Sequence, residues 1–154
     1  MTTGYQIAKT LVGLQEHRDK DKLMGLFKAQ GIMNPVHPKE VFNPDGLDKH
    51  GLPWCAAFVT YCERVARGDK VRIRYAARDF LTYGEDIGKD LTKAKEGDIL
   101  VFTRGANSYS GHVTYFTGVI DKDGYIRCLG ANQSDSVCVA FYKPTGLLGI
   151  RRVV

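Results

Sequence analysis

Pro53-Trp54-Cys55-Ala56-Ala57-Phe58-Val59 is the stretch that decides how this sequence is interpreted. A proline followed by an apolar run predicts the first turn of a helix, because proline is tolerated where no backbone N–H donor is needed. Cys55 would lie among unpaired N–H groups at the positive end of the helix dipole, which favour a thiolate over a thiol. A thiolate is a nucleophile, so Cys55 is a candidate catalytic residue. Buried structural cysteines are also common, and the stretch alone does not separate the two roles.

The residues before and after this stretch predict more helices in the first half of the chain. Apolar residues recur at helical spacing from about residue 3 to 15, and Asp19 is a candidate N-cap for a helix that closes at Gly31. Prolines and glycines punctuate residues 32–52, which predicts a loop. The helix that carries Cys55 is expected to start at Pro53 or Trp54 and to end near Arg67, and a shorter helix is expected over residues 75–83.

The second half of the chain is rich in β-forming residues. Asp121-Lys122-Asp123-Gly124 predicts a hairpin turn between two of the strands. Helices first and strands after predict a single α+β domain over residues 1–154, with an antiparallel sheet packed on the helix that carries Cys55. The expected strands cover residues 98–103, 113–120, 125–129, 137–142 and 148–153.

The composition indicates one globular domain with a basic surface. The 154 residues are 44% hydrophobic, and 22 basic against 17 acidic residues give a net charge of +5. This charge indicates an anionic partner, without choosing among nucleic acid, a membrane and a cell-wall polymer. The densest basic segment, residues 64–78, is interpreted as a solvated helix end and loop. No apolar run could span a bilayer and residues 1–6 do not read as a secretory signal, so we expect cytoplasmic synthesis and no membrane insertion.

The four cysteines point away from a metal site. They include no CxxC pair and no zinc-ligand spacing with histidine, so neither a metal nor another cofactor is expected. Cys62 follows Cys55 by two helical turns and is expected in the core. Cys128 and Cys138 fall on successive predicted strands, and reduced thiols are expected there.

A cysteine nucleophile needs a general base, and the base needs a group that orients its ring. Of the four histidines, His112 stands out because it follows Gly111 and opens a predicted strand, whereas His17, His37 and His50 lie in charged or loop segments.

The orienting group should come from the next strand, in Gly130-Ala131-Asn132-Gln133-Ser134-Asp135. A tight turn on Asp123-Gly124 would bring Asp135 opposite His112. A longer loop would bring Gln133 there, and a further shift or a bulge would bring Asn132. A slip of one residue also changes the face of the sheet, so the pattern leaves these alternatives open.

Four motifs, in this order, resemble the signature of a family of cell-wall hydrolases. They are Trp54–Val59, Gly97–Phe102, Gly111–Val113 and Gly130–Asp135, and Leu147–Arg152 is similar as well. The family is the CHAP-like branch (cysteine, histidine-dependent amidohydrolase/peptidase) of the NlpC-type papain-like superfamily, and the likeness extends from about Thr10 to the C-terminus. Many of its small single-domain members resemble bacteriophage endolysins.

The resemblance implies a papain-like fold and a cysteine peptidase or amidase that cleaves peptidoglycan and so lyses bacteria. The protein is expected to be a monomer, since nothing in the sequence demands more. It makes Cys55 the nucleophile, His112 the base and Asn132 the polar third residue, while Gly97-Asp98 is structural. Many relatives carry a glutamate at the position of Gly130, so either Asn132 holds the ring alone or Asp135 substitutes. Residues expected to contact the substrate are Trp54, Gln133 and Asp135.

The resemblance also implies a route out of the cytoplasm and raises the question of a calcium site. An endolysin of this kind would leave the cytoplasm through a holin or a secretion machine. Some relatives bind calcium in an acidic loop before the cysteine, but Asn43, Asp45 and Asp48 fit that spacing poorly and are interpreted as a solvated turn. Two alternative functions are a non-catalytic wall-binding domain with a degenerate site and a basic nucleic-acid-binding protein. The second would bind with a steep dependence on salt.

Overall fold

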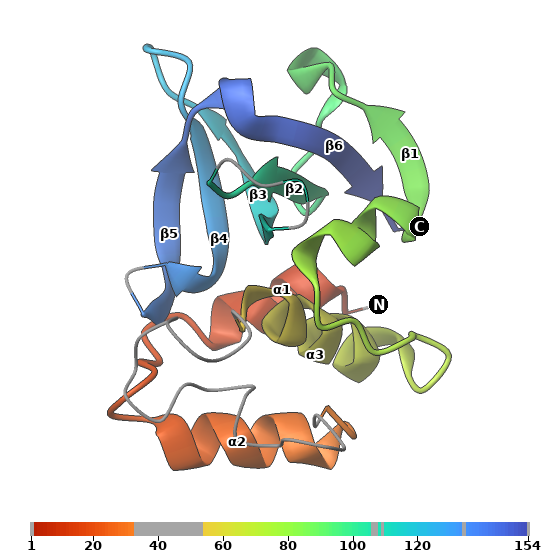
Figure 1. The fold of residues 1–154 in the computed structure, drawn as a ribbon, viewed down its shortest axis with the longest axis vertical. Coiled ribbons are helices and arrows are strands. Elements are labelled where there is room, and N and C mark those ends of the chain that lie inside the picture. Colours follow the sequence, from red (N-terminus) through yellow and green to blue (C-terminus); the bar gives the residue numbers. More distant parts are fainter. Residues whose placement is uncertain (1, 33–53, 106–107, 109, 134, 154) are drawn as a thin grey trace.

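The structure is a computed structural model that describes residues 2–32, 54–105, 108, 110–133 and 135–153, with only the backbone of Asn132. The chain is α+β, and its strands form an antiparallel sheet after the first helices, as predicted (Figure 1). Outside the described residues lie His37 and His50, and the segment considered for calcium with Asn43, Asp45 and Asp48.

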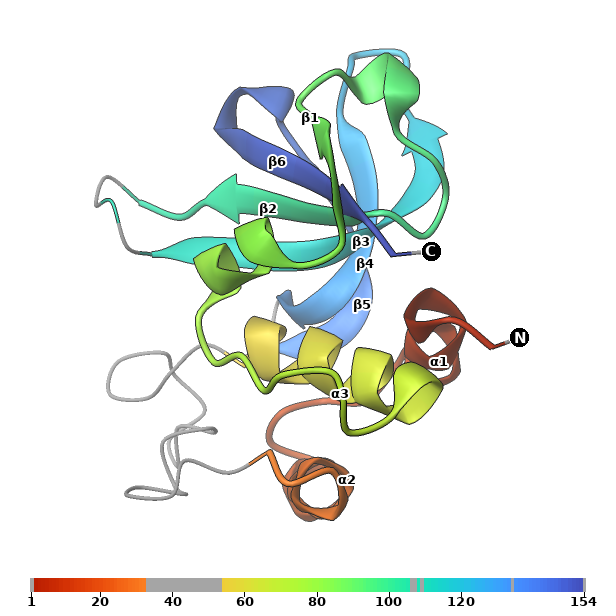
Figure 2. The ribbon, with the colours of Figure 1, turned by 90° about the vertical axis from the view of Figure 1, so that its right-hand side faces the viewer.

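In the described part of the chain, three α-helices lie on one side of the sheet, and α3 is the central one. They are α1 (Gly4–Thr10), α2 (Lys20–Ala29) and α3 (Cys55–Arg67). α3 contacts α1 and α2 as well as the sheet, so it separates α2 from the strands (Figures 1 and 2). It ends at Gly68, whose φ of 88° is easily adopted only by glycine. The expected helix over residues 75–83 is a 3-10 helix, η2 (Ala77–Thr82).

Six strands form one sheet in the order β1-β6-β2-β3-β4-β5, and every neighbouring pair is antiparallel. The strands are β1 (Glu85–Gly88), β2 (Ile99–Thr103), β3 (Gly111–Ile120), β4 (Ile126–Gln133), β5 (Ser136–Tyr142) and β6 (Leu147–Arg152). Two further 3-10 turns are η3 (Leu91–Lys93) and η4 (Pro144–Gly146).

Strand β1 was not expected from the sequence. Its residues Glu-Asp-Ile-Gly have low β-propensity, so local pattern gave no signal. The strand forms because it pairs with β6 at the edge of the sheet, where Asp86 lies opposite Arg151 and their side chains make an ion pair of 3.5 Å. Tertiary pairing therefore creates this strand.

The buried side chains form two apolar clusters, one on each face of the sheet. The first joins α3, α1 and α2 to residues such as Val113 and Tyr115 of β3. The second joins β2, β3, β4 and β6 through Phe102, Phe116 and Ile150, among others. Adjacent residues of β3 thus contribute to different clusters, as the alternation of side chains along a strand requires.

A buried carboxylate fixes α3 against β3. Glu63, on α3, accepts hydrogen bonds from the hydroxyls of Tyr115 (2.7 Å) and Tyr83 (2.8 Å). It also forms an ion pair with Arg67 (3.3 Å). Burial and the nearby Glu63 carboxylate both raise the pKa of Tyr115. Residue 4 must be glycine in this packing, because a Cβ there would lie 1.6 Å from Glu63 Oε2. The network holds the helix that starts at Cys55 in a defined position on the sheet.

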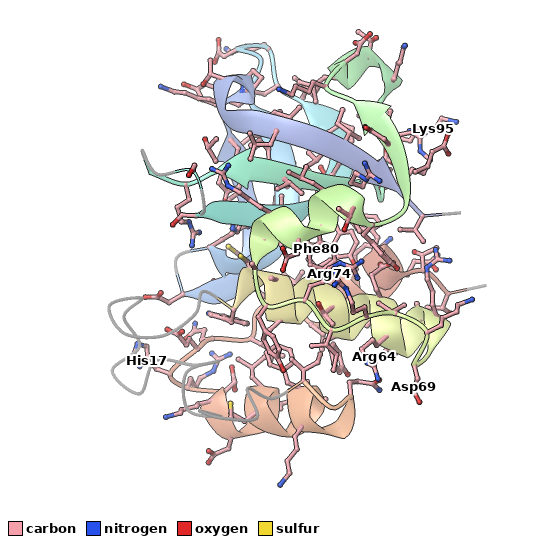
Figure 3. The ribbon with its side chains drawn as sticks, turned by 45° about the vertical axis from the view of Figure 1, so that its right-hand side comes forward. His17, Arg64, Asp69, Arg74, Phe80 and Lys95 are labelled. Carbon is pink, nitrogen blue, oxygen red and sulfur yellow. The ribbon has the colours of Figure 1, made fainter. Side chains whose placement is uncertain are left out.

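The basic segment after α3 is largely structural. Arg64 donates to the carbonyl of Gln30 (3.0 Å) and pairs with Asp69 (2.9 Å), and Arg74 packs its guanidinium 5.5 Å from the ring centre of Phe80 (Figure 3). Arg78 donates to the carbonyl of Ser110 (2.7 Å). These arginines hold the segment 68–83 to its neighbours, which weakens the interpretation of a nucleic-acid-binding patch. Among the described helices, none is both long and apolar enough to cross a membrane.

Candidate functional site

Cys55 is the first residue of α3, one or two positions after the start at Pro53 or Trp54 that the sequence predicts, and it lies in the first turn as expected. Its side chain is 1% exposed and belongs to the same apolar cluster as Val113 of β3 and Ala131 of β4. The first turn of α3 lies beside the end of β4 (Figure 2). Trp54 is fully buried and packs against Phe27, with ring centres 6.5 Å apart. Trp54 is thus part of the core, and the expectation that it contacts substrate stays a prediction.

His112 is the second residue of β3 and is 2% exposed. Its Nε2 lies 3.0 Å from Gln133 Oε1 and 3.1 Å from the Tyr142 hydroxyl. On the other side of the ring, Nδ1 lies 3.3 Å from Nη2 of Arg104. Both ring nitrogens therefore have partners in this structure.

These partners determine which nitrogen carries the proton. A guanidinium can only donate, so Nδ1 must accept from Arg104 and the neutral ring must be protonated at Nε2. The Gln133 amide is oriented by its own nitrogen, which donates to the carbonyl of Cys138 (2.7 Å). Its oxygen then faces His112 and accepts the Nε2 proton. The result is a neutral imidazole whose Nδ1 lone pair can act as a base.

The surroundings keep this imidazole neutral over a wide pH range. Burial lowers the pKa of His112 from the usual 6.5 to about 4, the hydrogen bond to Gln133 raises it in part, and the positive charge of Arg104 lowers it further. A base with this pKa is unprotonated at neutral pH, and it is a weaker base than an ordinary imidazole as long as Arg104 lies against Nδ1.

The free energy of unfolding should decrease as the pH is lowered, because of this histidine. Between pH 6.5 and 4 the unfolded chain binds a proton on His112 and the folded protein does not, so acidification favours unfolding. The expected loss across this window is about 3 kcal/mol. Urea denaturation at several pH values, compared with His112→Asn, measures it. Equal pH dependence in the two proteins would contradict the assignment of this shift to His112.

Gln133 is the residue that the structure brings to the imidazole. Near the site β3 and β4 pair Tyr115 with Leu129, a register that would carry position 132 opposite His112. The pairing of β4 with β5 shifts between Gly130 and Gln133, which marks an irregularity at this place. A Cβ at residue 130 would lie 2.5 Å from Thr114 Oγ1 and 3.0 Å from Gln133 Oε1. The Gln133 amide thus occupies the space that a side chain at residue 130 would need.

The other candidates from this segment have different surroundings. Gln133 is 3% exposed, and its amide contacts His112 and the carbonyl of Cys138; the expectation that it contacts substrate stays a prediction. Asp135 has a positive φ of 57°, and its carboxylate lies within 4.8 Å of the carboxylate of Glu16 and a ring nitrogen of His17. The backbone of Asn132 is part of β4, and its proposed catalytic role stays a prediction.

Sequence reasoning did not find Tyr142 or Arg104. The Tyr142 ring stacks on Phe102 at 5.2 Å and lies 5.1 Å from the His112 ring. Burial raises the pKa of Tyr142, and the thiols of Cys128, Cys138 and Cys55 contribute in the same direction. Tyr142 therefore packs directly against the imidazole of His112. Tyr142 is the last residue of β5, 30 positions from His112 in the sequence, and Arg104 follows the last residue of β2, 8 positions from His112. Nothing in their local sequence separates these two residues from ordinary surface residues.

None of the four cysteines, all of which lie in the described part of the chain, forms a disulfide in this structure. Cys128 lies opposite Ala140 and Cys138 opposite Gly130, so the two are not direct cross-strand partners. Cys138 donates through its thiol to the backbone carbonyl of Gln133 (3.3 Å), and so it supports the residue that holds the imidazole.

Comparison with known proteins identifies the family. A family model described as the CHAP domain matches residues 47–132, which is more than half of the chain and contains both Cys55 and His112. No curated protein matches the chain. CHAP domains imply a papain-like fold and are usually amidase or peptidase domains that act on peptidoglycan. With this match and the α+β architecture, the chain belongs to the CHAP family.

Proposed function

We propose that this protein cleaves an amide bond of peptidoglycan by acyl transfer through Cys55. The observation that supports the proposal most is the state of His112, a neutral imidazole with its proton on Nε2 and its lone pair on Nδ1. Such a ring can take a proton from a thiol, and α3, which begins at Cys55, packs on the strand that carries it.

The reaction has two stages. In the first, Nδ1 of His112 takes the thiol proton of Cys55 while the sulfur attacks the amide carbonyl carbon. The resulting oxyanion would be met by the backbone N–H of Cys55, at the start of α3. The imidazolium then gives its proton to the leaving amine as the C–N bond breaks. In the second stage, His112 activates water, which hydrolyses the thioester and restores the thiol.

Digestion of purified peptidoglycan tests this function. Mass spectrometry of the soluble fragments should show new amino and carboxyl termini with intact glycan linkages. The masses also distinguish an endopeptidase, which cuts within the peptides, from an N-acetylmuramoyl-L-alanine amidase. Binding to the wall without new termini would favour a non-catalytic wall-binding domain. Lysis of cells after release through a holin or a secretion machine, as for an endolysin, is part of the same proposal.

Gln133 is proposed as the positioning residue of His112. Gln133→Ala should lower kcat/KM by about 10- to 100-fold, because the ring loses its hydrogen bond and its fixed orientation. Gln133→Glu should keep more activity and move the acid limb of the pH–rate profile upward, since a carboxylate beside Nε2 favours the imidazolium. The pH profiles of the purified variants measure both effects.

The comparison variants are Asn132→Ala and Asp135→Ala. If orientation belongs to Gln133, Asp135→Ala should retain activity near that of the unmodified protein, since its carboxylate lies beside Glu16 and His17. A pH–rate profile that is unmoved in Gln133→Glu, together with a loss confined to Asn132→Ala, would assign the orienting role to Asn132 instead.

A further inference from the structure

We propose that Arg104 determines substrate specificity: its guanidinium covers Nδ1 of His112 in the free protein and transfers to a carboxylate beside the scissile amide, which uncovers the base. This inference rests on the proposed function and adds to it a class of substrate, an acidic peptide. It also assigns a role to a residue that no motif indicates.

The guanidinium of Arg104 and the thiol of Cys55 compete for one lone pair, on Nδ1 of His112. Nε2 of His112 is occupied by Gln133 Oε1 and lies beside the Tyr142 hydroxyl, so only Nδ1 can accept the proton of a thiol. In this structure Nδ1 instead accepts from Nη2 of Arg104 at 3.3 Å. A single lone pair does not serve two donors in line at once. Proton transfer from Cys55 therefore requires Arg104 to leave this position.

The second argument is what could draw Arg104 away. Its contact with Nδ1 is one long hydrogen bond to a neutral acceptor. A carboxylate offers two oxygens in the geometry of the guanidinium fork, and such charge-assisted pairs are shorter and stronger. A substrate carboxylate is thus a better partner than the imidazole. A carboxamide, which has one acceptor oxygen and no charge, competes much less well.

The third argument is position. Arg104 follows directly after β2, and the last pairs between β2 and β3 are Phe102 with His112 and Thr103 with Gly111. Arg104 is half-buried, whereas His112 is almost fully buried. Arg104 therefore lies at the end of β2, beside Nδ1 of His112, and is more exposed than the imidazole that it covers.

The charge of Arg104 also links substrate binding to the basicity of His112. The charge of Arg104 lowers the pKa of His112 and acts in the same direction on Tyr142. A carboxylate that pairs with Arg104 would offset this charge and make the imidazole a stronger base. Binding of an acidic substrate would then both expose Nδ1 and increase its affinity for the thiol proton.

The test uses two synthetic stem peptides with the same scissile amide, one with a free carboxylate on the adjacent residue and one with a carboxamide. The unmodified protein should cleave the carboxylate peptide with a kcat/KM about 10- to 100-fold higher. In Arg104→Gln this preference should fall to nearly one, and Arg104→Lys should retain part of it. The matched control is Arg72→Gln, which removes the same charge from an exposed position and should keep the preference. An undiminished preference in Arg104→Gln would overturn the inference.

A binding measurement separates this inference from the proposed function. Cys55→Ala protein, titrated calorimetrically, should bind the carboxylate peptide more tightly than the carboxamide peptide, and Cys55→Ala/Arg104→Gln should bind both alike. The ¹⁵N shift of His112 Nδ1 should change only with the carboxylate peptide. Selective binding without cleavage by the unmodified protein would sustain the role of Arg104 and reject the hydrolase. Cleavage without selectivity would do the reverse, and equal binding of both peptides by Cys55→Ala would reject the role of Arg104.

Discussion

Cys55→Ala abolishes the release of new termini from purified peptidoglycan, with a loss of at least about 10⁴-fold in rate, if Cys55 is the nucleophile. The loss is this large because the acyl-enzyme is a thioester on the sulfur of Cys55, at the start of α3. Alanine has no sulfur, so the acyl-enzyme cannot form. The measurement is mass spectrometry of the soluble fragments over time, with circular dichroism to show that the variant is folded.

Cys62→Ala is the matched control for this experiment. Cys62 lies two turns further along the same helix and is fully buried. Burial and the adjacent Glu63 raise the pKa of its thiol well above the ordinary value, so it stays protonated and unreactive. This variant should therefore retain activity, with a modest loss of stability from the small cavity. Equal rates for Cys55→Ala and the unmodified protein would remove the nucleophile from the mechanism.

Glu63→Ala should destabilise the protein by about 3–5 kcal/mol. The substitution removes the acceptor for the hydroxyls of Tyr115 and Tyr83 and leaves the charge of Arg67 without its buried partner. Because this network fixes α3 on β3, activity should fall as well, even under conditions where the variant is still folded. Urea denaturation monitored by fluorescence and circular dichroism gives the free energy of unfolding.

Glu96→Ala provides the comparison for Glu63. Glu96 is exposed and accepts one hydrogen bond of 3.3 Å from the Tyr5 hydroxyl. Its removal should change the free energy of unfolding by less than about 1 kcal/mol. A loss in Glu63→Ala as small as this would show that the buried network does not stabilise the contact between α3 and β3.

Local sequence predicted most of the elements because their signals are local. The proline and the apolar run predict a helix start at Pro53 or Trp54, and α3 begins at Cys55. Gly68 follows the end of that helix, and Asp19 precedes α2, although its side chain makes no capping hydrogen bond. Strands β2 to β6 follow β-rich runs, and their boundaries agree with the expectation to within a few residues. Strand β1 was missed because it exists through pairing with β6, which no local pattern encodes.

The partner of His112 could not be chosen from the sequence, because strand register depends on small irregularities. The expected alternatives were Asp135, Gln133 and Asn132, which lie within four consecutive positions of the chain. In the structure, the β3–β4 pairing shifts between Phe116 and Ile120, and the β4–β5 pairing shifts again between Gly130 and Gln133. Each shift changes which side chain faces the imidazole, so the alternatives can be separated only in three dimensions.

The sequence by itself determined the α+β class, the helix that begins at Cys55, the strand that begins with Gly111-His112 and the likeness to the CHAP family. These follow from residue types, their spacing and their order, which act over short stretches of chain. Only the tertiary structure decided that Gln133 and Tyr142 meet Nε2, that Arg104 meets Nδ1, and that Glu63 holds α3 to β3. Those contacts join side chains from separate elements, and they depend on register, burial and charge after the chain has folded.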